Sequence, residues 1–145
     1  MTIRPCRASD AASIALLSGE LGYPAAEAAA LARVEDLLGR SDHALLAAER
    51  AGEVVGWLHM RETRALESEP AGEIAGLVVG AGHRGQGSGR ALVEAGLAWA
   101  AARGLAEVRV RSNVVRDDAH RFYRGLGFAQ LKTQAVFSRS PRPPA

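Results

Sequence analysis

Cysteine, lysine and aromatic residues are scarce in this sequence. The single cysteine, Cys6, excludes a disulfide within the chain and any cysteine-rich metal site, so a reducing compartment such as the cytoplasm is expected. Aromatic residues make up only 5% of the chain, so alanine, leucine and valine must supply most of the core. Lys132 is the only lysine, and arginines, with their planar forked donors, carry the remaining positive charge.

Long apolar runs and a marked charge excess are also missing. No stretch approaches the roughly 18 apolar residues of a membrane span, and residues 1–10 lack the apolar run of a signal peptide. The formal net charge of +2 is too small to predict a nucleic-acid-binding protein. We therefore expect a globular protein that binds neither membrane nor nucleic acid, with one domain over residues 1–138 and a frayed tail over 139–145.

The spacing of apolar residues predicts a mixed α+β (α/β) fold. Strands are expected over 2–6, 44–49, 54–61, 73–79, 107–112 and within 128–138. Helices are expected over 10–21, 88–103 and 117–126, with another helix that ends at residue 38. The polar segment 62–72 contains Pro70 and is expected to be a loop. Consecutive strands predict antiparallel pairing, whereas the strand–helix–strand unit over 73–112 predicts one parallel pair.

A glycine-rich loop follows the apolar strand at 73–79, and it allows two interpretations. Residues 80–85 read G-x-G-x-x-G, the dinucleotide fingerprint, so an NADP-binding oxidoreductase is one alternative. However, that fingerprint usually opens a domain, and more than half of this chain precedes it. The strand after it should also end in an acidic residue, whereas here it ends R-V-R-S.

Residues 84–89 also read R-x-x-G-x-G, placed between a strand and a helix. Gly87 and Gly89 let the backbone approach a ligand closely, and the free amides of a helix N-terminus attract an anion. Arg84 and Arg90 would add positive charge on either side. A pyrophosphate fits such a loop, although a ligand-free glycine turn explains it equally well when the loop is taken alone.

A second motif, A-H-R-F-Y-R-G-L-G-F at 119–128, follows the next strand. Together the two motifs resemble the GNAT superfamily of N-acetyltransferases, in particular its small aminoglycoside-acetyltransferase-like members, over nearly the whole chain. The resemblance implies the GNAT fold, a mostly antiparallel mixed sheet with a splayed parallel pair and about four helices. It also implies transfer of acetyl from acetyl-CoA to a primary amine of a small molecule or peptide by direct attack on the thioester. A non-catalytic CoA-binding sensor domain is the alternative, and a homodimer is expected because dimers are common in the family.

The resemblance assigns the contacts with CoA. The backbone of Leu77, Val78 and Val79 would hold the pantetheine arm. The loop that would hold the pyrophosphate comprises Arg84, Gly85, Gln86, Gly87, Ser88, Gly89 and Arg90. Many members carry an asparagine seven residues before the motif tyrosine; here that residue is Arg116, and Asn113 is the expected contact instead.

The same resemblance assigns the catalytic groups. Tyr123 would be the general acid, because a phenol with a pKa near 10 remains protonated at neutral pH and can protonate a leaving thiolate. Glu73 opens its strand at the offset of the catalytic glutamate in histone-acetyltransferase relatives, so it is the predicted base. His59 is a second candidate, because imidazole titrates near neutrality.

The acceptor would lie near the first two helices and the loop over 62–72. By resemblance, this points to Glu20, Tyr23 and Trp57. The acidic residues of the loop, Glu62, Glu67 and Glu69, suggest a cationic amine, although a solvated surface explains them as well. The histidines do not cluster with Cys6 at a metal-ligand spacing, so no metal is expected.

Overall fold

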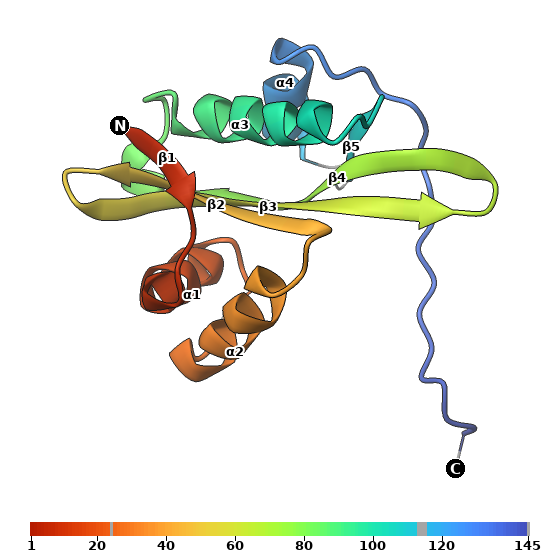
Figure 1. The fold of residues 1–145 in the computed structure, drawn as a ribbon, viewed down its shortest axis with the longest axis horizontal. Coiled ribbons are helices and arrows are strands. Elements are labelled where there is room, and N and C mark those ends of the chain that lie inside the picture. The colour runs from red at the N-terminus through yellow and green to blue at the C-terminus, as the bar shows by residue number, and fades with distance from the viewer. Residues whose placement is uncertain (24, 113–115, 145) are drawn as a thin grey trace. The chain divides into compact units, whose positions relative to one another are not determined.

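The computed structural model describes residues 1–23, 25–112 and 116–144, and it divides into two compact units, Met1–Arg111 and Ser112–Ala145. The first unit contains one sheet with the strand order β1-β2-β3-β4-β5 (Figure 1). Its strands are β1 (Thr2–Pro5), β2 (His43–Arg50), β3 (Glu53–Ala65), β4 (Ser68–Val79) and β5 (Val108–Val110). Its α-helices are α1 (Ala11–Glu20), α2 (Glu27–Leu38) and α3 (Ser88–Ala102), while α4 (Asp117–Gly125) belongs to the second unit.

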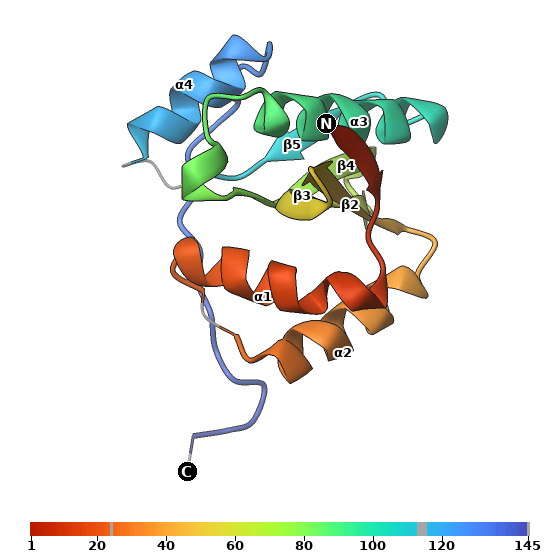
Figure 2. The same cartoon turned by 90° about the vertical axis from the view of Figure 1, so that its left-hand side faces the viewer.

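The sheet is mixed, as the sequence predicts. Neighbouring strands from β1 to β4 pair antiparallel, and β4 pairs parallel with β5 over Gly72–Ile74 and Val108–Val110. Figures 1 and 2 show α1 and α2 on one face of the sheet and α3 on the other. Among the described residues, no helix is long and apolar enough to cross a membrane.

Small residues let α3 pack tightly on the sheet. Leu58 and Met60 of β3 are fully buried against α3, together with Leu92. An added Cβ at Gly96 would lie 2.7 Å from Leu58 Cδ2, so only glycine allows this close approach. The opposite face packs on α1 and α2 through a buried cluster of Cys6, Val34, Leu45 and Ala47.

The segment 62–72, predicted to be a loop, is a hairpin instead. β3 continues to Ala65 and β4 begins at Ser68, with the fully exposed Leu66 in the turn. The prediction was wrong because it treated Pro70 as a breaker. Pro70 occurs where the β3–β4 register shifts between Thr63 and Ala65, and it has no strand partner there, so its missing N–H breaks no ladder bond.

The strands predicted within 128–138 are absent from the described structure. Residues 128–140 follow α4 without regular structure, and Val136 and Phe137 are 87% and 92% exposed. Alternating apolar residues make a segment compatible with a strand, but only a paired neighbour makes it one.

Candidate active site

The glycine-rich loop joins the end of β4 to α3 in the first unit. A short 3-10 turn, Ala81–His83, opens it, and Gly85 and Gly87 have φ of +77° and +84°, which favours glycine at both positions. Gly80 N donates a hydrogen bond to Val55 O at 2.8 Å, which ties the start of the loop to β3. The loop is therefore a shaped element whose turns depend on the glycines that the motif supplies.

Gly87 is the N-cap of α3 and leaves the helix amides uncapped. No side chain caps this end, and the first helical bond along the chain is donated by Ala91 N to Gly87 O. The amides of Ser88, Gly89 and Arg90 consequently have no acceptor within the helix. Free amides and the positive end of the helix dipole form a cradle suited to an anionic group such as a phosphate.

The arginines around the loop are arranged differently from the sequence-based expectation. Arg84 is exposed, but Arg90 Nε donates to Glu94 Oε1 at 3.0 Å, one turn along α3. The guanidinium that contacts the loop belongs to Arg50, at the end of β2. Its Nη2 donates to Gln86 O at 2.7 Å and its Nε to Ser88 Oγ at 3.3 Å. Sequence reasoning missed Arg50, because these partners lie 36 and 38 residues away.

The C-terminal half of β4 has one unpaired edge among the described strands. Leu77, Val78 and Val79 pair with β3, but β5 pairs only as far as Ile74. Just before this half, the register with β3 shifts so that Ala75 has no partner, which is a β-bulge. Backbone groups on that edge are thus available to an extended ligand beside the cradle.

Glu73 lies near the middle of β4 and not at its start as predicted, because the strand begins at Ser68; the residue is 7% exposed. Its Oε1 accepts hydrogen bonds from Arg61 Nη2 at 3.0 Å and from Arg111 Nη1 at 2.8 Å. A buried carboxylate needs such partners, because an unpaired charge out of water is very costly. The sequence did not reveal this pairing, since the three residues come from β3, β4 and the segment after β5.

His59 lies beside this group, on the face of β3 that α1 and α2 cover. His59 Nε2 and His43 Nδ1 lie 2.8 Å apart, within hydrogen-bond distance. Burial, with help from His43 and Arg61 and against the pull of Glu73, lowers the pKa of His59 to about 4. His59 is uncharged at neutral pH, and because its imidazolium form is disfavoured, it is a weak base for an ammonium group.

The three predicted substrate residues have different surroundings. Trp57 lies on the same face of β3 as His59; its Nε1 is buried without a hydrogen-bond partner, and its ring occupies the space that a Cβ on Gly76 would need. Glu20, at the end of α1, accepts a hydrogen bond from Ala81 N at 3.1 Å. Tyr23 is 72% exposed.

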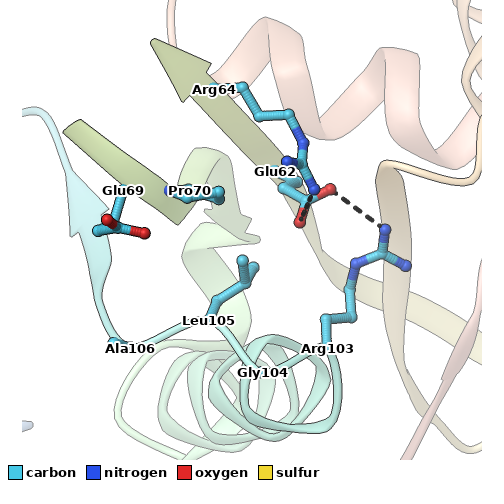
Figure 3. A pocket seen from close by; sticks show the side chains of 8 residues that line it. All are labelled: Glu62, Arg64, Glu69, Pro70, Arg103, Gly104, Leu105 and Ala106. Carbon is cyan, nitrogen blue, oxygen red and sulfur yellow. Dashed lines mark hydrogen bonds and ion pairs between the residues drawn. The ribbon is translucent and has the colours of Figure 1, made fainter. Parts of the chain in front are cut away.

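Two of the three loop acids, Glu62 and Glu69, line a pocket whose lining does not include Trp57. Glu62 bridges Arg64 and Arg103 and lines a pocket of about 300 Å³ with Glu69 (Figure 3). This pocket borders the C-terminal end of α3, whereas the cradle is at its N-terminal end, and a helix of 15 residues is about 22 Å long. Glu62 and Glu69 thus line a pocket separate from the cradle, and their link with the acceptor stays a prediction.

Tyr123 belongs to α4, in the second unit. Its ring makes edge contacts with Phe122 and Phe128, at centroid distances of 5.1 and 5.6 Å. Burial raises the pKa of the Tyr123 phenol, so it stays protonated at neutral pH and can donate. Asn113, the predicted contact with the pantetheine arm, lies outside the described residues.

Histidine, cysteine, aspartate and glutamate side chains do not gather in groups of three that could hold a metal ion anywhere in residues 1–23, 25–112 and 116–144. The groups that the structure does assemble are the amide cradle, the open edge of β4 and the paired carboxylate of Glu73. Such a set can bind an extended ligand that carries an anionic end.

Comparison with known proteins agrees with this arrangement. The acetyltransferase (GNAT) family model matches residues 12–128. The chain is 32% identical to an aminoglycoside N(6')-acetyltransferase type 1 of Stenotrophomonas maltophilia over 148 residues, which cover 99% of this chain and 95% of that protein. It is 36% identical to the mycothiol acetyltransferase of Thermobispora bispora over 94 residues; the match covers 63% of this chain but only 32% of that relative.

A solved structure has the same fold. The aminoglycoside 6'-N-acetyltransferase of Acinetobacter haemolyticus superposes with a TM-score of 0.83 at 22% identity, covering 97% of this chain and 99% of that one. The family match spans the strand, loop and helix that form the cradle as well as the motif around Tyr123. The chain therefore belongs to the acetyltransferase (GNAT) family, a family of acyl-transferring enzymes.

Proposed function

We propose that this enzyme transfers the acetyl group of acetyl-CoA to a primary amine of a small molecule. The observation that carries the proposal is the uncapped N-terminus of α3 behind Gly87, directly after the open edge of β4. The amides of the cradle would bind the pyrophosphate, and the edge of β4 would pair with the amides of the pantetheine arm. An extended cofactor with one anionic end matches this arrangement.

The acceptor must lose a proton before it attacks. An amine with a pKa of about 10.4 is neutral in only roughly one molecule in two thousand at pH 7, a cost of about 4–5 kcal/mol. We propose Glu73 as the base, acting through Oε2, since Oε1 holds both arginine contacts. A carboxylate can also pair with the incoming ammonium group, which the uncharged imidazole of His59 cannot do, and this favours Glu73.

The bonds and protons then balance as follows. The amine nitrogen forms a bond to the thioester carbonyl carbon, the carbon–sulfur bond breaks, and the thiolate takes a proton from the Tyr123 phenol. After attack, the nitrogen gives up a second proton, which restores the phenol. The first proton, which Glu73 took from the ammonium group, passes to solvent, so one proton per turnover is released. We assign this role to Tyr123 because its raised pKa keeps the phenol protonated, and so able to donate a proton, at neutral pH.

For the acceptor, we propose an amino sugar of the aminoglycoside type. The relative that aligns over 99% of this chain is named for that substrate. We propose that the two units form one domain, because the family match runs across their boundary at residue 111. We also propose that the enzyme works in the cytoplasm as a homodimer, which gel filtration with light scattering tests.

A thiol-release assay tests the activity. Purified protein, acetyl-CoA and a panel of aminoglycosides, polyamines and peptides are mixed, and free CoA is followed with a thiol reagent. Burial raises the pKa of the Cys6 thiol to about 12, so the protein's own cysteine adds little background. We expect aminoglycosides with a primary amine to accelerate thiol release, with an acetylated product of matching mass.

Two results would contradict the proposal. If acetyl-CoA binds but no amine accelerates thiol release, a CoA-binding sensor is the better interpretation. If peptides or polyamines are used and aminoglycosides are not, the acceptor class is wrong while the acetyl transfer stands.

A further inference from the structure

Arg50 connects the end of β2 with the glycine-rich loop before α3, and it lies outside both family motifs. It ends β2 and is followed by a tight turn with Ala51 at φ +50° and Gly52 at φ +80°. From there its guanidinium contacts the loop before α3 through Gln86 O and Ser88 Oγ. Ser88 is only 1% exposed, so the second contact is anchored on a buried residue.

Both acceptors of Arg50 are neutral. Among the described residues, no carboxylate lies within ion-pair distance of Arg50, whereas Arg90 has Glu94. The positive charge of Arg50 is thus not cancelled locally, and it contributes to the field at the cradle. A cation behind the loop favours an anion in front of it.

The contact with Gln86 O also orients the loop. A trans peptide is planar, so its C=O and N–H point in opposite directions. Because the carbonyl of Gln86 points to Arg50, the N–H of Gly87, in the same peptide, points away from Arg50. Gly85 and Gly87 on either side are flexible positions that would otherwise let this peptide rotate.

We propose that Arg50 is a positioning residue for the diphosphate of the acyl donor, holding the 86–87 peptide in its binding orientation before the donor arrives. This inference rests on the proposed function. It means that Arg50 favours donors that carry the diphosphate over truncated donors that lack it. Such preorganisation lowers the ordering cost of binding.

The test compares two donors, acetyl-CoA and S-acetylpantetheine, which lacks the diphosphate. For Arg50→Ala we expect KM for acetyl-CoA to rise about tenfold, since a hydrogen bond from a charged group is lost, with kcat changed less than twofold. The kcat/KM for acetylpantetheine should stay at the wild-type value. Arg50→Lys keeps the charge but not the fork, so it should show an intermediate KM for acetyl-CoA.

Arg40→Ala is the matched control, because Arg40 is an exposed arginine that pairs with Asp36 away from the loop. It should leave both donors unaffected. The NMR order parameter of the Gly87 N–H, measured on the unliganded protein, gives a readout without turnover: it should be lower in Arg50→Ala than in wild type.

The outcomes separate the two proposals. Equal losses with both donors, or no change with either, overturn the role of Arg50. If Arg50→Ala fails to fold, the donor comparison rests on Arg50→Lys, and an unchanged donor preference there overturns the role equally. If the wild type itself neither binds acetyl-CoA in a thermal-shift assay nor releases thiol, the proposed function fails instead.

Discussion

At the scale of single residues, the groups proposed as acid and base have different surroundings. Burial keeps the phenol of Tyr123 protonated, and burial beside His43 keeps His59 neutral. Glu73 is instead surrounded by donors, with Arg61 and Arg111 on one oxygen. We therefore propose the protonated phenol as the acid and the paired carboxylate as the base, and each role has its own test.

Tyr123→Phe tests the acid. Removing the hydroxyl should lower kcat about a hundredfold, within the usual contribution of a general acid, while the affinity for acetyl-CoA stays nearly intact. Steady-state kinetics and calorimetric titration with acetyl-CoA measure the two quantities. Unchanged turnover would remove Tyr123 from the chemistry.

Glu73→Gln tests the base. The change should lower kcat/KM at pH 7 by about a hundredfold, and the deficit should shrink as the pH approaches the pKa of the acceptor amine, which then needs no base. Glu107→Gln is the control, since Glu107 is a more exposed glutamate that also pairs with an arginine. A deficit that stays constant across pH, or that simply follows a fall in melting temperature, speaks against a base.

At the scale of secondary-structure elements, the start of α1 is held by a buried ion pair. Asp10 is 6% exposed, accepts from Arg4 Nη1 and Nη2 at 2.8 and 2.9 Å, and caps the turn by accepting from Arg7 N at 2.8 Å. The hydrogen bonds from Arg4 lower the pKa of Asp10 despite its burial. This contribution to stability is present above pH 4 and is lost as the pH falls through the lowered pKa.

Asp10→Asn should therefore destabilise the protein by about 2 kcal/mol at neutral pH, because Arg4 loses its main partner and keeps only Glu49. Urea unfolding at pH 7 and pH 3 measures this, and the gap between variant and wild type should narrow at pH 3. Asp36→Asn, in an exposed pair on α2, should change stability by less than about 0.5 kcal/mol. A gap that is as wide at pH 3 as at pH 7 contradicts the role of the Asp10 charge.

The loop before α3 makes a second prediction at this scale. Gly87→Trp places an indole at the N-cap and forces a side chain into a left-handed backbone, so acetyl-CoA binding should be lost. Gly104→Trp is the control: it has the same kind of positive φ and open space, but it lies just past the other end of α3. Normal binding by Gly87→Trp, measured calorimetrically, means that the cradle is not the phosphate site.

At the scale of the whole molecule, the cradle predicts which ligand stabilises the fold. Acetyl-CoA at a hundred times its dissociation constant should add about 2.7 kcal/mol to stability and raise the melting temperature, whereas NADP should not. Thermal-shift measurements with both ligands check this. A shift with NADP alone would revive the dinucleotide interpretation of residues 80–85.

The sequence was sufficient for local features and insufficient for distant pairings. Periodicity and glycines predicted the helices and most strands of the first unit, including the helix after R-x-x-G-x-G. The prediction of a loop failed at Pro70, because a register shift accommodates the proline within the hairpin. The prediction of strands failed at residues 128–138, because a strand needs a paired neighbour. Arg50 was invisible for the same reason, because nothing local in β2 indicates a contact with the loop before α3.

The exposed turn between β3 and β4 has a practical consequence. Leu66 protrudes fully into solvent at the tip of this hairpin, and β4 separates it from the glycine-rich loop (Figure 1). A cysteine introduced there would be the sole reactive thiol on the protein, because Cys6 is buried. Leu66→Cys thus offers a single handle for a fluorophore or a solid support, from which the enzyme can be immobilised with its cofactor cradle left open.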